Sequence, residues 1–573
     1  MKIWKQREFD KEEEERLISN GKGKLLARLL VQREVTVETV DKFLDTDYKS
    51  LRSPFDLHDM EKAVKIFHEV VKANGKVVVS ADYDCDGITS SLMIRELCDT
   101  VGISCKVFLP SRMEHGYGLN PKTISALKNM MGEELPDLLF VLDCGMNNSD
   151  QIDILKNDIG VKNVIVIDHH LGAGSGVSTN ADALVTWHLS EGHEEMCACG
   201  EVFQFIRGVK KVLPKVNPIE FITYAAMGTI ADISPIVGNN RIIVKNGLTS
   251  YAINHVPTAG LMALMRKARI LVPSLTQEDI SFRIAPKINA VGRMHHPDLA
   301  LGLLSEKDPT TSDKIAEHVM SYNDQRKKLQ KKIEKEADGY VNDSNPESGI
   351  LVYDEEWHIG VVGIVASRLT ETFNKPAIVI GKHNGNWKGS GRSVPGVNVK
   401  EILDMCSEMF TNYGGHAAAV GMTIKPEYIE KAPKLFDEAC KKYYSKHKID
   451  LDSTMFFDAC LGTKAINIET AQSLRKHLYP YCKDNNPEPV FMIQDVVIYN
   501  IEVKAGDGWR IVKFQIQKDD VQIEYPFKIF SDYYGEALEG KQVDLFFSFP
   551  QMYEIKPNRW SEFELSAIDI IEK

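Results

Sequence analysis

Three apolar, β-branched runs in the first third of the chain each end in an aspartate. VVVSAD ends at Asp82, LLFVLD at Asp143 and VIVID at Asp168. Such runs, alternating with longer helical patterns, are typical of buried parallel strands joined by crossover helices. The carboxyl ends of the strands in an open parallel sheet border its ligand crevice. The sequence therefore predicts an α/β fold in which three strands bring acidic groups to one edge of a sheet.

Length and composition limit the class of protein. The 573 residues suffice for roughly three or four domains, and 43% hydrophobic with 26% charged residues is an ordinary globular composition. No run of about 18 apolar residues occurs and the N-terminus is charged, so we expect a cytoplasmic protein with no membrane span. The ten cysteines include no CxxC pair, which argues against a zinc ribbon or a disulfide framework. A net charge of −12 excludes indiscriminate coating of nucleic acid but permits a local basic channel and cation-binding carboxylates.

The pattern of elements predicts two α/β lobes joined by a long helix, followed by a small β-barrel. A charged segment at 311–341 has helical composition and no Gly or Pro until Gly339. We expect GSGRSVPG at 389–396 to be a glycine-rich turn, and the alternating runs at 496–503, 510–517 and 542–549 to be strands. The expected division is 1–310 for the first lobe with an N-terminal extension, 311–345 for the connecting helix, 346–445 for the second lobe and 446–573 for the barrel.

The densest chemical signal is an acidic loop directly after the first of these strands. Asp82, Asp84 and Asp86 follow one another at every second position. One aspartate would suffice to cap the next helix, whereas three would repel and raise each other's pKa unless a cation neutralised them. A calcium EF-hand is the rival, but position 12 of its loop would be Met93 instead of Glu. A metal site is therefore the better interpretation.

Two histidines and two further acids extend this signal. His169 and His170 directly follow Asp168, while Asp143 and Asp232 come after other apolar runs. Each alone is more often a surface or capping residue. Together with the acidic loop they offer the oxygen and imidazole ligands that suit a pair of Mn²⁺ or Mg²⁺ ions.

The motifs that carry these residues resemble a known superfamily. DYDCDG, VLDCG, DHH and ADISP resemble the DHH phosphoesterases, and GVVGIVASRL, GSGRS and GGHAAAVGM resemble the DHHA1 domain that follows the DHH domain. SPFDLHDMEKAV, PSRMEHGYGLN and INAVGRM resemble the RecJ family within that superfamily, and NPEPVF resembles the start of its OB-fold. The resemblance covers nearly the whole chain.

The resemblance implies a role for each motif residue. Asp168 would orient the histidines through hydrogen bonds, and His170 would face the scissile phosphate. The alternative to a DNA-binding role for each arginine is an ordinary ion pair on the protein surface. Strand contacts of the OB-fold would include Trp509, Arg510, Lys513 and Phe514, unless these aromatics are core residues. The implied metal ligands are Asp82, Asp84, Asp86, Asp143, His169 and Asp232. The implied catalytic residues are these ligands except Asp82, together with His170. The implied DNA contacts are Arg112, Arg293, Ser390, Arg392 and His416.

The resemblance also implies an activity. It is that of a Mn²⁺- or Mg²⁺-dependent 5′→3′ exonuclease, a monomer that degrades single-stranded DNA to nucleoside 5′-monophosphates in repair and recombination. Its implied partners are a single-strand-binding protein and a RecQ-type helicase. One alternative is a phosphoesterase of the same superfamily acting on short oligonucleotides or cyclic dinucleotides, against which the third lobe counts. Another is an inactive RecJ-like replication scaffold, against which the complete set of motif acids counts.

Overall fold

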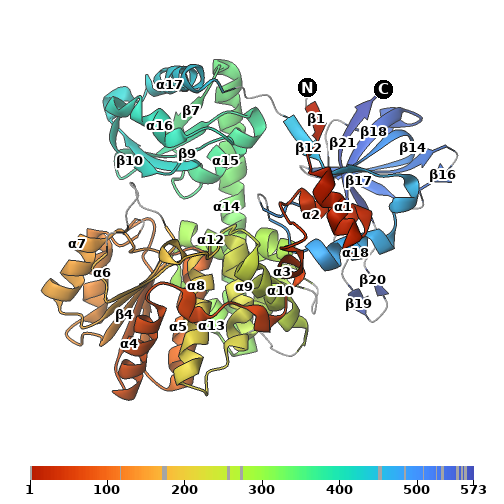
Figure 1. Cartoon of the computed structure of the whole chain (residues 1–573). Coiled ribbons are helices and arrows are strands. Elements are labelled where there is room, and N and C mark those ends of the chain that lie inside the picture. Colours follow the sequence, from red (N-terminus) through yellow and green to blue (C-terminus); the bar gives the residue numbers. More distant parts are fainter. Residues whose placement is uncertain are drawn as a thin grey trace.

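The computed structural model arranges the chain as two α/β units beside one long helix, with a β-rich unit alongside (Figure 1). It describes residues 3–573 except 117, 171–176, 178, 254–257, 271–274, 450–453, 483–484, 507–508, 520, 524, 531–533, 550–553, 557–558 and 561–563, and no side chains at 250–253, 509, 536, 554–556 and 559–560. Tyr117 and the side chain of Trp509, which belong to motifs above, thus lie outside the described part. Among the described residues, no helix is both long and apolar enough to cross a membrane.

The first unit is built on a five-stranded parallel sheet. Its strand order is β3-β2-β4-β5-β6. The strands are β2 (Val77–Ala81), β3 (Cys105–Phe108), β4 (Leu138–Leu142), β5 (Val164–Ile167) and β6 (Ala183–Val185). Ala81 pairs with Leu142 and Leu142 with Ile167, so the three strands end level with one another. This confirms the predicted strands and the single acidic edge.

Helices cover both faces of this sheet. Along β4, Phe140 faces one buried core while Leu139 and Val141 face another, as the alternation of a strand requires. The covering helices are α4 (Met60–Lys72), α5 (Cys85–Val101), α6 (Pro121–Met131) and α7 (Ser149–Asp153).

A helical subdomain completes the first unit. Helix α9 has the sequence ITYAAMGTIA and its first nine residues are all buried, as its all-round apolar composition predicts. The subdomain consists of α8 (Ala198–Val212), α9 (Ile222–Ala231), α10 (Gly238–Ile253), α11 (Ala259–Lys267), the π-helix η6 (Asp279–Ile284), α12 (Ala285–Met294) and α13 (Asp298–Ser305).

The predicted long helix is confirmed as α14 (Pro309–Ser344). The Asp308 carboxylate caps it by accepting the Thr311 N–H, Pro309 occupies its first turn, and Asn345 ends it in a left-handed conformation. It packs against both α12 of the first unit and α15 (Val362–Phe373) of the second.

The second unit is built on a five-stranded sheet with the order β10-β11-β9-β8-β7. Its elements are β7 (Ile350–Asp354), α15 (Val362–Phe373), β8 (Ala377–His383), β9 (Asn386–Arg392), α16 (Val399–Asp404), β10 (Phe410–Gly415), β11 (Ala419–Ile424) and α17 (Ala432–His447).

One prediction for the second unit was wrong. Residues 389–392 of the expected glycine-rich turn form the end of strand β9. A side chain at Gly389 would come within 2.8 Å of both Ile380 and Met422, and one at Gly391 within 2.7 Å of Val420. The glycines therefore serve close packing between neighbouring strands rather than a turn.

The C-terminal unit contains the three predicted strand runs. Strand β14 pairs with both β18 and β15, so that β14, β18, β21, β17 and β15 follow one another in a closed series of pairings. Phe514 is only 1% exposed and stacks on Phe527, so the prediction that it contacts a nucleic-acid strand was wrong and the core alternative holds. The elements are β12 (Thr454–Phe457), β13 (Ala459–Cys460), α18 (Ile468–Leu478), β14 (Phe491–Gly506), β15 (Trp509–Lys518), β16 (Val521–Gln522), β17 (Phe527–Phe530), β18 (Gln542–Ser548), β19 (Glu554–Lys556), β20 (Arg559–Trp560) and β21 (Leu565–Glu572).

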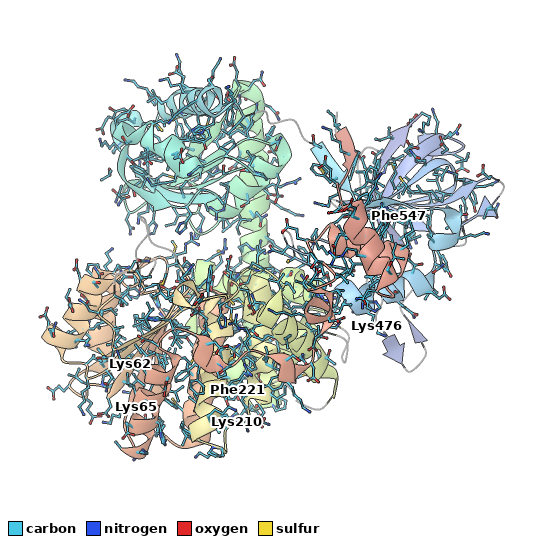
Figure 2. All side chains as sticks on the ribbon, in the orientation of Figure 1. Lys62, Lys65, Lys210, Phe221, Lys476 and Phe547 are labelled. Atoms are coloured by element: carbon cyan, nitrogen blue, oxygen red, sulfur yellow. The ribbon has the colours of Figure 1, made fainter. Side chains whose placement is uncertain are left out.

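The N-terminal segment packs on this C-terminal unit. Strand β1 (Ile3–Gln6) pairs with β12, and helices α1 (Lys11–Ser19), α2 (Lys24–Val31) and α3 (Val40–Leu44) follow it. Leu17 and Leu30 share one apolar core with Phe547, and both chain ends lie in this unit (Figures 1 and 2). The expected division places this segment in the first lobe as an N-terminal extension, because the sequence holds no local signal of pairing between β1 and β12.

Candidate metal centre

The acidic loop after β2 sends its three carboxylates to different partners. Asp84 caps α5 by accepting the N–H groups of Asp86 and Gly87. The Asp86 carboxylate accepts the N–H groups of Ala198 and Cys199 at the start of α8, at 2.9 and 2.8 Å. Asp82 is buried, and its Oδ1 accepts no hydrogen bond from a described residue. Asp84 and Asp86 thus serve the first turns of two different helices, whereas Asp82 caps neither of them.

Asp143 and His169 bring two more unsatisfied atoms to the same place. Asp143 follows β4 with a left-handed φ of 59°, which re-aims its carboxylate at the sheet edge. Its Oδ1 lies 3.3 Å from His169 Nε2, and both atoms are buried without a hydrogen-bond partner in the described residues. Buried polar atoms are rarely left unsatisfied, so an array of acid and imidazole atoms in this state fits a cation.

The acids and histidines form two adjoining groups around these atoms. His169 Nε2 lies 3.7 Å from Asp86 Oδ2 and 4.0 Å from Asp232 Oδ1. Asp82, Asp84 and Asp143 form a second group, and in each group the ligand atoms lie within 4.8 Å of one another. Asp143 also groups with His169 and His170, so it links the two positions. The arrangement can hold two cations side by side.

Asp168 orients the second histidine. Its Oδ1 lies 2.9 Å from His170 Nδ1, and it also accepts the N–H groups of Met146 and His170. Burial by itself would lower the pKa of His170, but the hydrogen bond and charge of Asp168 outweigh it and raise this pKa to about 9. His170 is therefore a cation at neutral pH, held between Asp168 and the acidic groups.

The carboxylates of the centre cannot all ionise by themselves. Burial, followed by the charge of Asp84, raises the pKa of Asp82 to about 8. Burial and the charge of Asp86 also raise the pKa of Asp143 and of Asp232. Divalent cations would remove this mutual repulsion.

We expect the stability of the metal-free protein to fall between pH 6 and pH 8. The folded state holds protons on these acids that the unfolded chain, with ordinary pKa values near 4, has already lost, so raising the pH favours unfolding. Saturating Mn²⁺ should add about 3 kcal/mol or more to stability, and its effect on Tm should be larger at pH 8. Calorimetry at both pH values, with NaCl of equal ionic strength as control, measures this. A Mn²⁺ effect on Tm that is equal or smaller at pH 8 would contradict it.

Three arginines form a basic cluster beside the acidic centre. Arg112 follows β3, Arg293 lies in the last turn of α12, and Arg392 ends β9 of the second unit. Burial and then the charge of Arg112 lower the pKa of Arg293, to about 10, and that of Arg392. None of the three makes an ion pair with a described residue, so the ion-pair alternative is not seen. Mutually repelling arginines of this kind suit an anionic ligand.

Ser390 and His416, the other two predicted DNA contacts, lie differently with respect to the arginine cluster. Ser390 Oγ accepts a hydrogen bond from Arg392 at 2.9 Å, and both side chains lie against Gly363 in the first turn of α15. His416 is exposed in the turn between β10 and β11, where its described hydrogen bonds are backbone bonds to Ala419. The structure thus joins Ser390 to the basic cluster but gives His416 no contact with it.

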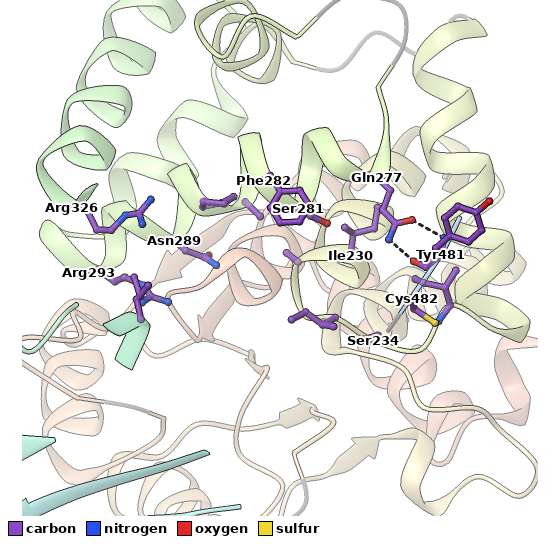
Figure 3. Close-up of a pocket in the computed structure, with 16 residues that line it drawn as sticks. Ile230, Ser234, Gln277, Ser281, Phe282, Asn289, Arg293, Arg326, Tyr481 and Cys482 are labelled. Carbon is purple, nitrogen blue, oxygen red and sulfur yellow. Dashed lines mark hydrogen bonds between the residues drawn. The ribbon is translucent and has the colours of Figure 1, made fainter. Parts of the chain in front are cut away.

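A cavity of about 470 Å³ adjoins Asp232 (Figure 3). Ile233 and Phe282 line it with side chains that are 72% and 76% exposed. Ile233 has a φ of 65°, which is uncommon and strained for a β-branched residue. Arg293 and Arg326 lie together at one end of the cavity.

The junction between α18 and β14 closes the other end of the cavity. The Tyr481 N–H donates to Gln277 Oε1 at 2.9 Å, and Gln277 Nε2 donates back to the Tyr481 carbonyl. The Ile236 N–H donates to Cys482 Sγ at 3.3 Å. The C-terminal unit is thereby attached to the loop that carries Asp232.

Comparisons with known proteins agree with this geometry. The family profile described as "DHH family, N-terminal domain" matches residues 76–229, and the DHHA1 domain profile matches residues 347–442. The chain is 28% identical over 510 residues to the single-stranded-DNA-specific exonuclease RecJ of Bacillus subtilis, and 28% identical over 457 residues to that of Haemophilus influenzae. The chain therefore carries a DHH family N-terminal domain and a DHHA1 domain, and it is similar to RecJ exonucleases over most of its length.

The matches to RecJ proteins differ in extent. The first alignment covers 87% of this chain but 62% of the B. subtilis RecJ, so the chain spans less than two thirds of that relative; the second covers 76% and 78%. The crystal structure of Thermus thermophilus RecJ in complex with Mn²⁺ superimposes with a TM-score of 0.80 at 22% identity, covering all of this chain and 80% of that one. A manganese-bound RecJ exonuclease matches with a TM-score of 0.60 at 27% identity, covering 69% of this chain and 98% of that one.

The motifs of the RecJ family did not point to every residue around the centre. Arg326 was missed because it lies in a charged helix whose composition is typical of a solvated surface. Ile233 and Phe282 gave no signal, since single apolar residues are usually core or incidental surface. Only the fold brings them beside Asp232.

Proposed function

We propose that this chain is a Mn²⁺- or Mg²⁺-dependent exonuclease that removes nucleoside 5′-monophosphates from the 5′ end of single-stranded DNA. The observation that carries the proposal is the juxtaposition of buried acid and imidazole atoms that have no hydrogen-bond partner among the described residues with three arginines that have no ion-pair partner among them. The acids suit hard cations and the arginines suit phosphate, which together are the requirements of phosphodiester hydrolysis.

The acidic groups would hold the ions. The proposed ligands are Asp82, Asp84, Asp86, Asp143, His169 and Asp232. When bound, a pair of Mn²⁺ or Mg²⁺ ions supplies a nucleophilic water at neutral pH and stabilises charge on the attacking and leaving oxygens. Asp143 would be shared between the two positions, since it belongs to a ligand group on each side.

His170 would act on the scissile phosphate. The hydrogen bond that His170 Nδ1 donates to Asp168 occupies one ring nitrogen, and Nε2, on the other side of the ring, would face the phosphate. Because the pKa of His170 is about 9, its ring carries a proton at neutral pH and can donate it toward phosphate oxygen.

The second unit would hold the 5′ end of the strand. Ser390 and Arg392 offer a hydroxyl and a forked guanidinium beside the first turn of α15, whose N–H groups favour anions. Arg112 and Arg293 would contact phosphates from the first unit. A strand anchored at its terminal phosphate presents its first internucleotide bond to the ions, which accounts for 5′→3′ polarity.

The C-terminal unit would be an OB-fold that guides the strand. The closed pairing order of five of its strands, β14-β15-β17-β21-β18, supports this, since an OB-fold is a five-stranded barrel. The junction at Tyr481 attaches this unit to the cavity beside Asp232, so a strand leaving the centre could continue onto it. We further propose a cytoplasmic monomer that works with a single-strand-binding protein and a RecQ-type helicase, as the RecJ resemblance implies.

The test uses one oligonucleotide labelled at either its 5′ or its 3′ end, with a duplex control. We expect immediate release of the 5′ label as mononucleotide, a progressively shortening 3′-labelled ladder, an intact duplex, and no reaction in EDTA. Release of the 3′ label first, or rapid cleavage of cyclic dinucleotides with an intact long strand, would overturn the proposal.

Replacing Arg392 by Gln should lower kcat/KM about 10- to 100-fold on a 5′-phosphorylated strand. The lost guanidinium–phosphate contacts are charge-assisted hydrogen bonds worth about 1.5–3 kcal/mol. The effect should be smaller on a 5′-hydroxyl strand, which steady-state rates on both substrates would reveal.

Lys65→Gln is the matched control for this loss of one positive charge. Lys65 lies with Asp137 and Asp182 at the amino ends of β4 and β6, the sheet edge opposite the acids (Figure 2). Its replacement should change neither rate more than twofold. An equal loss on both substrates in Arg392→Gln would rule out recognition of the 5′ end by this residue.

A further inference from the structure

Two cysteines lie directly behind the candidate metal centre. Cys197 and Cys199 flank the start of α8, and both are fully buried. Their Sγ atoms are 3.5 Å apart. The backbone N–H groups of Ala198 and Cys199 are those that hold the Asp86 carboxylate, so the thiols and this carboxylate share one turn of chain.

The three side chains have the spacing of a metal-ligand set. The Sγ atoms and an Asp86 carboxylate oxygen lie within 4.8 Å of one another. Two thiolates bound to one tetrahedral Zn²⁺ at about 2.3 Å would be about 3.8 Å apart. The observed 3.5 Å thus needs an adjustment of only a few tenths of an ångström.

Gly228 of α9 leaves the space that these side chains occupy. A Cβ at this position would approach Cys199 Sγ to 2.2 Å and Asp86 Oδ1 to 2.9 Å. Any side chain there would displace the thiol or the carboxylate. The pocket between α5, α8 and α9 is therefore shaped around sulfur and oxygen atoms.

The thiols differ in chemical preference from the catalytic ligands. Thiolates select soft or borderline cations such as Zn²⁺ and Cd²⁺, whereas carboxylates suit Mn²⁺ and Mg²⁺. Asp86 belongs to both groups, because its Oδ2 also lies 3.7 Å from His169 Nε2. An ion entering through the catalytic centre would reach the thiols by way of this shared carboxylate.

We propose that Asp86, Cys197 and Cys199 form a second cation site, for a thiophilic divalent cation, that overlaps the catalytic centre at Asp86; its occupation draws Asp86 away from the catalytic ions and inhibits the enzyme. Binding would release the two thiol protons to solvent, and a chelator would reverse it. The inhibitory half rests on the proposed nuclease function; the binding half does not.

Binding is tested on the metal-free full chain with Cd²⁺ alone as the probe. Thiolate-to-Cd²⁺ charge-transfer absorbance gives the stoichiometry, and the ¹¹³Cd resonance of the wild-type protein reports sulfur ligation without any substitution. We expect Cys197→Ser/Cys199→Ser to lose one equivalent of Cd²⁺ and the sulfur-ligated resonance. Cys440→Ser, which alters a buried thiol in the other α/β unit, should lose neither. A wild-type protein without a sulfur-ligated resonance, or a double variant that keeps it, would overturn the site.

Inhibition is tested by adding Zn²⁺ or Cd²⁺ to the Mn²⁺-driven nuclease reaction. Each protein is compared with its own rate before addition, so a folding defect in the variant does not count as resistance. Half-inhibition of the wild type should need at least tenfold less Zn²⁺ than that of the double variant. Equal sensitivity in the two proteins would overturn the inhibitory role. A wild type inactive in Mn²⁺ would instead overturn the proposed function, with the Cd²⁺ binding result still standing.

Discussion

Asp143→Asn is expected to lower kcat about 10³-fold or more in Mn²⁺ while leaving the fold intact. Its buried Oδ1 accepts no hydrogen bond from a described residue and belongs to a ligand group on each side, so the substitution removes charge from both cation positions. Loss of about 4 kcal/mol of charge stabilisation corresponds to this factor. Asparagine tolerates the left-handed φ of 59° at this position, so the backbone should not change.

The same substitution should not destabilise the metal-free protein. It removes one member of a group of carboxylates whose pKa values are raised by burial and mutual repulsion, so the metal-free Tm should be unchanged or higher. Single-turnover rates, Mn²⁺ titration by calorimetry and thermal melts measure the three effects. Residual activity above about a tenth would mean that Asp143 holds no catalytic ion.

Asp137→Asn is the matched control because it lies at the other end of the same strand. Asp137 precedes β4 and pairs with Lys162 on the surface at 2.6 Å. Exposed pairs contribute at most about 1 kcal/mol, so this variant should lose a little stability and less than half of its activity.

His170→Ala is expected to lower kcat about 10²- to 10⁴-fold without weakening Mn²⁺ binding to a similar degree. A positioned proton donor contributes a factor of this size, and the bond to Asp168 fixes both the ring and its proton. The measurement is a pH–rate profile at saturating Mn²⁺ together with a Mn²⁺ titration. A kcat within threefold of wild type would exclude His170 from the reaction.

Asp168→Asn tests the role of the His170 proton while the imidazole ring stays in place. Asp168 raises the pKa of His170 to about 9, so in the wild type the activity that depends on the protonated ring should decline only as the pH passes about 9. Without the Asp168 charge this pKa falls and the alkaline decline should move to lower pH. An unchanged profile would mean that the His170 proton is not used.

The acidic edge of the first sheet could be predicted from sequence because its signal is local. The runs that end at Asp82, Asp143 and Asp168 combine β-branched composition with a strand-end acid, and parallel register then brings the acids together. The different hydrogen-bond roles of the individual acids were not predictable. Nothing in DYDCDG shows that Asp84 caps a helix while Asp86 accepts two N–H groups from α8, which lies more than a hundred residues further on.

Features that depend on long-range packing could not be predicted. Phe514 and its neighbours alternate like any strand, and the choice between core and surface depends on which face of the sheet is covered by the rest of the unit. Arg326 joins Arg293 only because α14 lies against α12. Gly389 looked like a turn residue because its packing partners, Ile380 and Met422, come from other strands.

The packing of β1, α1 and α2 on the C-terminal unit sets the order in which parts of the protein can fold during synthesis. Synthesis runs from the N-terminus, so α1 and α2 leave the ribosome before the two α/β units, whereas Phe547 and the other C-terminal members of their apolar core leave it after them. The two α/β units can fold before the C-terminal strands are synthesised, but during that time Leu17 and Leu30 lack the residues against which they pack. A nascent chain halted anywhere before β14 would therefore expose the apolar faces of α1 and α2, a natural target for chaperones, until the strands of the C-terminal unit have been synthesised.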